Sequence, residues 1–182
     1  FGAIKIECTE SVTILNCLFN YCGVSNGSLA SVIHNSFSDY FEINNCIFSK
    51  CGVDGKKNLI TVDRSPRFEL INTLFKDCNG GINIQVSGSV NIKNNNFTNN
   101  NDYINITDAT TTSDINEFNL YNNNFINSIS NEATIIFHSY YGNSDIKIGK
   151  CYFFNCTAHS CCYFNIKKLV EANVNISNCC IK

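Results

Sequence analysis

Thiol and imidazole side chains are concentrated near the C-terminal end of the chain. Cys151, Cys156, His159, Cys161 and Cys162 lie within twelve residues of one another. Cysteine thiolates and histidine nitrogens at such spacings are the ligands that hold Zn²⁺ tetrahedrally. The chain has 12 Cys among 182 residues, and such a density is also typical of disulfide-stabilised proteins. The segment therefore raises two chemical hypotheses, a metal site and a disulfide framework.

Most of the cysteines, however, recur at fixed places in a repeat. Eight of the twelve fall in two columns, in which Cys alternates with Asn, Thr and Ser. The first column is Cys17, Cys46, Thr73, Asn95, Asn123, Cys151 and Cys179, and the second is Cys22, Cys51, Cys78, Asn100, Ser128 and Cys156. A disulfide needs a matched partner at a defined geometry, whereas a small stacked side chain can be any of these types. We therefore predict two structural ladders.

The ladders leave few residues for a metal ion. A structural zinc site needs four ligands that converge on one point. Any such site would draw on Cys156, His159, Cys161 and Cys162. A disulfide from Cys161 or Cys162 to the adjacent repeat is an alternative. We expect no metal site and no cofactor.

The repeat is built on the segment Phe41–Cys51, FEINNCIFSKC. Related segments begin at Val12, Phe68, Val90, Phe118, Ile146 and Val174, so successive copies start 22 to 29 residues apart. Periods of this length are typical of solenoids and related arrays. We interpret residues 1–182 as a single repeat domain and expect it to be a piece of a longer chain.

Each period contains three short strands. Within Phe41–Cys51, apolar residues alternate, two Asn residues interrupt and an apolar pair resumes, which predicts a strand, a bend and a second strand. A further alternating segment occurs at residues 3–6, 29–33, 59–62, 81–86, 103–106, 134–137 and 163–166. One period cannot bury its own apolar face, so the coils must stack. The predicted fold is an all-β parallel β-helix with six to seven coils of roughly 28 residues.

Stacking places equivalent residues on one another, about 4.8 Å apart. The aromatic column of the core would contain Phe19, Phe48, Phe75, Phe97, Phe125 and either Phe153 or Phe154, followed by Cys180 or Ile181. Asn is unusually abundant, and it is the commonest non-glycine residue in the left-handed backbone conformation. Many tight bends would account for this abundance, and an A/T-rich codon bias would do so equally.

Composition restricts the partners. The formal net charge is −2 and hydrophobic residues make up 44% of the chain, which predicts a buried core and no basic field for a phosphate backbone. No segment approaches the roughly 18 apolar residues that span a bilayer. We therefore expect neither nucleic-acid binding nor direct membrane insertion. Polar loops such as residues 107–116 are the expected contact surfaces.

Catalysis by a β-helix would require acidic residues grouped on an outer face. Glycoside hydrolysis uses two carboxyl groups at a defined separation, and lyase chemistry uses a Ca²⁺ site beside a base. Asp102, Asp108 and Asp114 are close in sequence, but we place the last two in a loop. The only arginines, Arg64 and Arg67, flank a Ser-Pro pair in another predicted loop. We predict that the chain is not catalytic.

Two local motifs resemble those of a known family. Gly80-Gly81-Ile82 begins one alternating segment, and the endings Phe-x-x-Asn and Phe-x-x-Cys recur, as in Phe97–Asn100 and Phe19–Cys22. These motifs resemble the GGAI and FxxN repeats of chlamydial polymorphic outer-membrane proteins. The Asn-rich and Cys-rich character is similar to that of β-helix surface proteins of protists such as trichomonads. The resemblance implies a right-handed coil and the passenger or stalk of an adhesin-like surface protein.

Three functions are consistent with these patterns. The first is a non-catalytic structural or adhesive module of a cell-surface or secreted protein, which binds a protein or glycan partner through its outer faces and loops. The second is an intracellular scaffold element with reduced thiols, packed in a larger assembly or stacked on neighbouring chains. The third is part of a carbohydrate-active enzyme, a polysaccharide lyase or hydrolase. Glycans on Asn26 or Asn96 would exclude the second.

Overall fold

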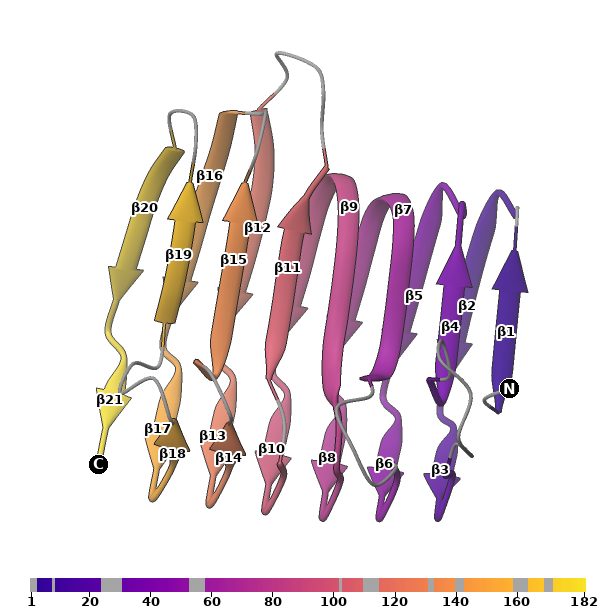
Figure 1. The fold of residues 1–182 in the computed structure, drawn as a ribbon, viewed down its shortest axis with the longest axis horizontal. Helices are drawn as coiled ribbons and strands as arrows, with labels where there is room; N and C mark the ends of the chain where they lie inside the picture. The colour runs from indigo at the N-terminus through magenta and orange to yellow at the C-terminus, as the bar shows by residue number, and fades with distance from the viewer. Residues whose placement is uncertain are drawn as a thin grey trace.

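The computed structural model describes residues 3–7, 9–23, 31–52, 58–101, 103–109, 115–130, 133–139, 143–158, 164–168 and 172–182. Neighbouring strands in the described part pair in parallel, with equivalent residues of successive repeats in register. Figure 1 shows these strands stacked along one axis, with the two termini at opposite ends. The fold is therefore the expected all-β parallel solenoid.

Each coil runs along three faces. The first face contains β1 (Ile4–Glu7), β4 (Ile33–Ser36), the first part of β7 (Asn58–Ile71), the first part of β9 (Gly81–Lys93), β11 (Ile104–Asp108), β15 (Ile135–Ser139) and β19 (Phe164–Lys168). The second face contains β2 (Ser11–Leu15), β5 (Tyr40–Asn44), the remainder of β7 and β9, β12 (Ile115–Tyr121), β16 (Asn143–Gly149) and β20 (Ala172–Ser177). The third face contains β3 (Leu18–Asn20), β6 (Ile47–Ser49), β8 (Leu74–Lys76), β10 (Asn96–Thr98), β13 (Asn124–Ile126), β17 (Tyr152–Phe154) and β21 (Cys180–Ile181). Two short strands, β14 (Ile129–Ser130) and β18 (Thr157–Ala158), pair with each other and follow the third-face strands β13 and β17 in sequence.

The coil is right-handed. In Figure 1 the chain rises along the first face, which is nearest the viewer, and descends along the second face behind it while it advances from right to left. The solenoid has about five turns, slightly fewer than the six to seven expected. The expected number included the terminal copies. On the third face, the five strands from β6 to β17 have neighbours on both sides, whereas β3 and β21 have one each.

One aromatic column fills the core beneath the third face. Its rings stack at centroid distances of 4.5 to 4.9 Å with interplanar angles of 3° to 9°. The column is Phe19, Phe48, Phe75, Phe97, Phe125 and Phe153. Phe154 is exposed, and Ile181 follows Phe153 in register. The ring spacing equals the separation of neighbouring strands, about 4.8 Å, because equivalent residues lie directly on one another.

Left-handed residues form the bends on either side of the third face. The first bend contains Asn16, Asn45, Asn72, Asn94, Asn122, Lys150 and Asn178, with φ between 50° and 57°. The second bend contains Tyr21, Lys50, Asp77, Asn99, Asn127 and Asn155, with φ between 49° and 54°. Amides in these columns also link the coils, as where Nδ2 of Asn127 donates to Oδ1 of Asn99 at 3.0 Å. Asparagine therefore occupies nine of these thirteen bend positions.

Three charged residues predicted in loops lie in strands instead. Arg64 and Arg67 belong to β7, and Asp108 is the last residue of β11. β7 accommodates Pro66 where its register with β9 shifts, since a bulge tolerates the missing N–H. Gly88 of β9 lies against this bulge, and a Cβ there would be 2.0 Å from the Pro66 carbonyl oxygen. The continuous strand therefore requires glycine at that position.

We predict that Phe97→Ala lowers the free energy of unfolding by about 3–5 kcal/mol. The Phe97 side chain is 1% exposed and stacks on Phe75 and Phe125, so its truncation leaves a cavity that the fixed coil spacing prevents from closing. Chemical denaturation followed by circular dichroism would measure the change. Thr98→Ala, at a partly exposed position of the same strand, is the matched control. A loss below about 1 kcal/mol for Phe97→Ala would contradict the stacked core.

Candidate functional site

The predicted ladder residues directly follow the bend residues and point into the solenoid. Asn95 shows the complete arrangement. Its Nδ2 donates to the Leu70 carbonyl at 2.9 Å, and its Oδ1 accepts the backbone N–H of Thr73 at 2.9 Å, both in the preceding coil. Asn100 makes the equivalent pair of bonds in the second ladder. These side chains satisfy backbone groups that the bend would otherwise leave unpaired.

Cysteine meets the same two requirements in this position. The thiol of Cys51 donates to the Phe19 carbonyl at 3.2 Å, and the sulfur of Cys46 accepts the backbone N–H of Cys17 at 3.5 Å. A thiol is a weaker donor and acceptor than an amide but has both capacities. This explains why Cys, Asn, Thr and Ser exchange within the columns. The nine described cysteines are free thiols.

Only one of the four alternative metal ligands lies in the described part of the chain. Cys156 belongs to the second ladder, and its thiol donates to the Phe125 carbonyl at 3.3 Å. His159, Cys161 and Cys162 lie outside the described residues. Among the residues that the structure does describe, no three His, Cys, Asp or Glu side chains are grouped closely enough to hold a metal ion.

The outer surface of the second face presents rows of side chains that follow the solenoid axis. Side chains alternate between the core and the surface along each strand, so positions two apart face outward together. Register between the strands aligns these positions from coil to coil. Two adjacent rows are Lys93, Tyr121, Gly149 and Ser177, and Asn119, Lys147 and Asn175, on β9, β12, β16 and β20.

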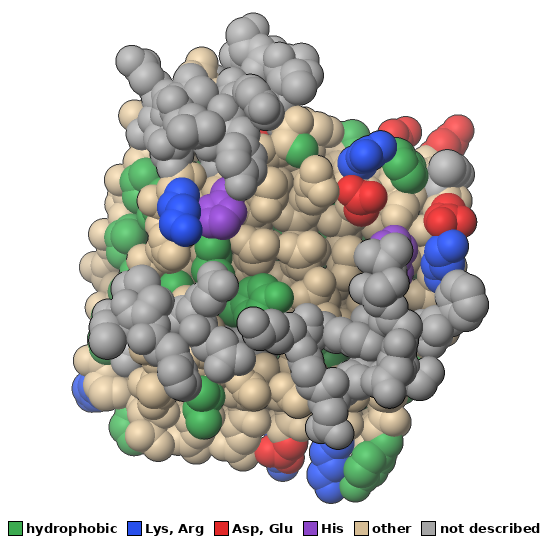
Figure 2. Space-filling view, in the orientation of Figure 1, with side chains coloured by type: hydrophobic (Ala, Val, Ile, Leu, Met, Phe, Trp, Pro, Cys, Tyr) green, Lys and Arg blue, Asp and Glu red, His purple; other side chains and the backbone are tan. Residues whose placement is uncertain are grey.

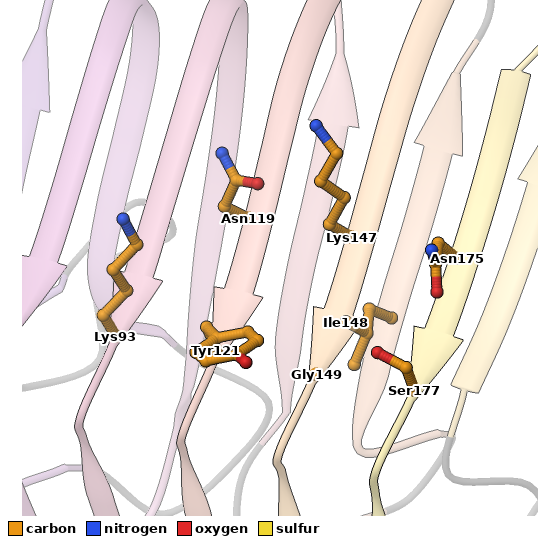
Figure 3. A pocket seen from close by; sticks show the side chains of 8 residues that line it. All are labelled: Lys93, Asn119, Tyr121, Lys147, Ile148, Gly149, Asn175 and Ser177. Atoms are coloured by element: carbon orange, nitrogen blue, oxygen red, sulfur yellow. The ribbon is translucent and has the colours of Figure 1, made fainter.

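These rows line a hollow of about 370 Å³, shown in Figure 3. We call it the Tyr121 hollow. Gly149 has no side chain in a row whose other members project outward, and the Tyr121 ring leans over it. A Cβ on Gly149 would lie 2.5 Å from Cε2 of Tyr121. The ring therefore forms part of the hollow's surface, and Tyr121 remains 39% exposed.

Two lysines, Lys93 and Lys147, line the hollow, and a third, Lys150, contacts the ring. Nζ of Lys150 lies 5.4 Å from the Tyr121 ring centroid, and Nζ of Lys147 lies 2.8 Å from Oδ2 of Asp145. The hydrogen bond from Lys147 to Asp145 raises the pKa of the lysine, which keeps it protonated. Lys93 forms no ion pair within the described part of the chain. The hollow is therefore bordered by positive charge at neutral pH.

The Tyr121 hollow combines an apolar surface with hydrogen-bonding groups. The ring offers an apolar surface, and Asn119, Asn175 and Ser177 offer hydrogen-bond donors and acceptors. An apolar surface with a few converging polar groups is the usual composition of a ligand site. Its lining contains no carboxylate or imidazole that could transfer a proton.

Two carboxylates on the same face were not singled out from the sequence. Glu42 and Glu69 are register neighbours on β5 and β7. Glu42 accepts hydrogen bonds from Oη of Tyr40 at 2.9 Å and Nδ2 of Asn44 at 3.0 Å. Glu69 accepts two from Arg67, at 3.1 and 2.6 Å. Burial, and then the bond to Glu42, raises the pKa of Tyr40, so its hydroxyl stays a donor. The carboxylates of Glu42 and Glu69 are thus both held by hydrogen bonds from neighbouring side chains.

Of the three acids that are close in sequence, the structure describes only Asp108. Asp108 is buried where the first face ends. Its carboxylate accepts hydrogen bonds from Nδ2 of Asn116 at 3.1 Å and Oγ of Ser144 at 2.8 Å. The predicted loop position is therefore wrong for Asp108, whose buried carboxylate links neighbouring segments. Asp102 and Asp114 lie outside the described residues.

The first face has a different character. Figure 2 shows that its described charged side chains include both signs, and that several of them lie near the N-terminal end of the solenoid. Lys5 and Glu7, for example, form an ion pair at 2.8 Å.

None of the residues that the structure describes belongs to a helix of the length and hydrophobicity needed to cross a membrane.

No family model, curated relative or solved structure matches the chain. The Tyr121 hollow must therefore be judged on its geometry. Sequence reasoning missed its residues because they face outward, where the copies differ from one another. The available signal was Gly149, which stands where the other copies have Leu15, Asn44, Ile71, Lys93, Tyr121 and Ser177.

We predict that Cys78→Asn keeps the free energy of unfolding within about 1 kcal/mol of the parent value, whereas Cys78→Val lowers it by about 1–3 kcal/mol. The Cys78 thiol donates to the Phe48 carbonyl at 3.4 Å. Asn can replace this donor, but valine, a somewhat larger apolar side chain, leaves the carbonyl unpaired. Urea denaturation under reducing conditions would measure both variants. Equal stability of the two would show that the ladder hydrogen bond is unimportant.

Burial raises the pKa of the Cys151 thiol from 9.0 to about 11. The unfolded chain therefore loses this proton at lower pH than the folded chain, so the thiol's contribution to stability is complete below pH 9 and is lost as the pH rises through about 11. We expect a loss of about 2 kcal/mol across this interval, measured by denaturation at several pH values with reductant. Cys151→Asn should lack this part of the decline. Identical pH profiles of stability for the parent protein and Cys151→Asn would contradict this contribution of the Cys151 thiol.

Proposed function

We propose that the chain is a non-catalytic binding module of a cell-surface or secreted protein. In this proposal the solenoid is a rigid support, and the outer surface of its second face recognises a glycan or protein partner. The observation that carries the proposal is the Tyr121 hollow, a concave site with an aromatic ring, amides and ammonium groups on the outside of the solenoid.

The support for a rigid scaffold is the continuity of its hydrogen bonds. Backbone bonds link successive coils through the bends, as from Asn122 to Gly149 at 2.9 Å and from Tyr152 to Asn123 at 2.9 Å. The inner ladder adds side-chain bonds at the same corners, including Nδ2 of Asn123 to the Ile92 carbonyl at 2.9 Å. A site on such strands is held in one geometry before the partner arrives, which lowers the entropic cost of binding.

A second observation supports a binding site on the outer surface: the inward side chains are all needed to form the core. The core side of the second face carries apolar residues such as Phe118, Leu120 and Ile148, which are at most 1% exposed. These pack against the aromatic column and the ladders, so substitutions there alter the fold. Outward side chains are free of this constraint. Recognition can therefore be built on the outer face without disturbing the coil.

We predict that Tyr121→Ala weakens partner binding at least about tenfold, because it removes the apolar surface of the hollow. The measurement is binding of the purified chain to an array of oligosaccharides and extracellular-matrix proteins, followed by titration with whichever compound binds. Tyr152→Ala, a partly exposed tyrosine on the third face, is the matched control. Equal binding by both variants would remove the hollow from the proposal. Absence of any binding by the parent chain would contradict the proposal.

A further inference from the structure

We infer that the Tyr121 hollow binds an anionic saccharide. The Tyr121 ring would contact the apolar face of one sugar, and the ammonium groups of Lys93 and Lys147 would contact its carboxylate or sulfate. This inference rests on the proposed function and adds the class of ligand. It follows from the charges, the uncharged polar groups and the position of the hollow along the face.

The charges favour an anion. Lys93 forms no ion pair with any described residue, and the ammonium group of Lys150 lies over the Tyr121 ring. The ion pair of Lys147 with Asp145 is on the surface, with side chains 49% and 26% exposed. Such pairs contribute little free energy, so Lys147 can turn to a ligand. Asp145 and its register neighbour Glu117 lie one row farther from Tyr121, beyond the lysine.

The uncharged groups favour a sugar as the carrier of that anion. Asn119, Asn175 and Ser177 line the hollow and together provide amide N–H groups, amide carbonyls and a hydroxyl. A sugar ring presents several hydroxyls, each a donor and an acceptor, beside apolar C–H groups. Amides and hydroxyls match the first, and the exposed aromatic ring matches the second. A simple inorganic anion would leave the ring and most of the amides unused.

Neighbouring coils determine which part of the face can receive the ligand. The row that contains Asn119 and Lys147 continues through Asn91 to Glu69 and Glu42 toward the N-terminal end. The carboxylates there repel an anion, although Arg67 offsets one of them. An anionic chain is therefore favoured over β9 to β20 and opposed over β5 and β7. The site spans about four coils, roughly 15 Å between its outermost strands.

The test is calorimetric titration of the full chain with three hexasaccharides: galacturonate, sulfated galactose and neutral galactose. We expect at least one charged hexasaccharide to bind about tenfold or more tightly than the neutral one, and to weaken as salt rises from about 50 to about 300 mM. Lys93→Gln and Lys147→Gln should each weaken the charged ligand about tenfold without altering the neutral one. The two charged ligands distinguish a carboxylate from a sulfate.

Two controls separate this inference from the proposed function. Lys76→Gln alters an exposed lysine on the third face and should leave every affinity unchanged. Gly149→Ala displaces the Tyr121 ring and should weaken charged and neutral ligands alike.

If the neutral hexasaccharide binds as well as the charged ones and loses affinity in Tyr121→Ala, the anionic class is wrong and the proposed function stands. If none of the three binds but a protein on the array does, the saccharide is wrong. Unchanged denaturation midpoints would exclude misfolding of the variants.

Discussion

Every coil of this protein depends on one hydrogen-bonding requirement at its bends. A left-handed residue interrupts the strand there, and nearby buried backbone groups need new partners. The inward side chain that follows supplies them, as Asn95 does for the Leu70 carbonyl and the Thr73 N–H of the preceding coil. Each group left unpaired would cost about 1–3 kcal/mol. The position is therefore restricted to small side chains that both donate and accept, and Cys46 and Cys51 occupy it as hydrogen-bonding groups.

This requirement divides the molecule into two parts with different constraints. Inside, the ladders hold coils at the strand spacing, and the same spacing sets the contact of Phe75 with Phe97 at 4.8 Å. A change of residue type inside the solenoid therefore alters packing and hydrogen bonding in the two adjacent coils. Outside, side chains also contact neighbours two residues away on the same strand, as Glu69 does with Arg67. Recognition chemistry can therefore change on the surface while the fold persists.

The same division explains what could be predicted from sequence. Core strands, ladder columns and the aromatic column repeat from coil to coil, so FEINNCIFSKC predicted the parallel solenoid. Phe153 and Phe154 were indistinguishable in type, and only register chose between them. The Tyr121 hollow was missed because its outward residues differ from copy to copy. Asp108 was misplaced because a buried carboxylate needs partners, here including Ser144, that lie far away in sequence.

A concave site on such a surface can arise from a departure within a row. Register fixes the backbone positions, so the chain cannot move inward to make a cleft or outward to fill one. Gly149 beside Tyr121 is such a departure, because the smallest residue lies next to a large one and the ring covers the vacant place. The inner bonds of the same corners, from Cys151 to the carbonyls of Leu120 and Gly149, prevent the strands from closing this gap. The geometry of the proposed binding site thus depends on the ladder that the bends require.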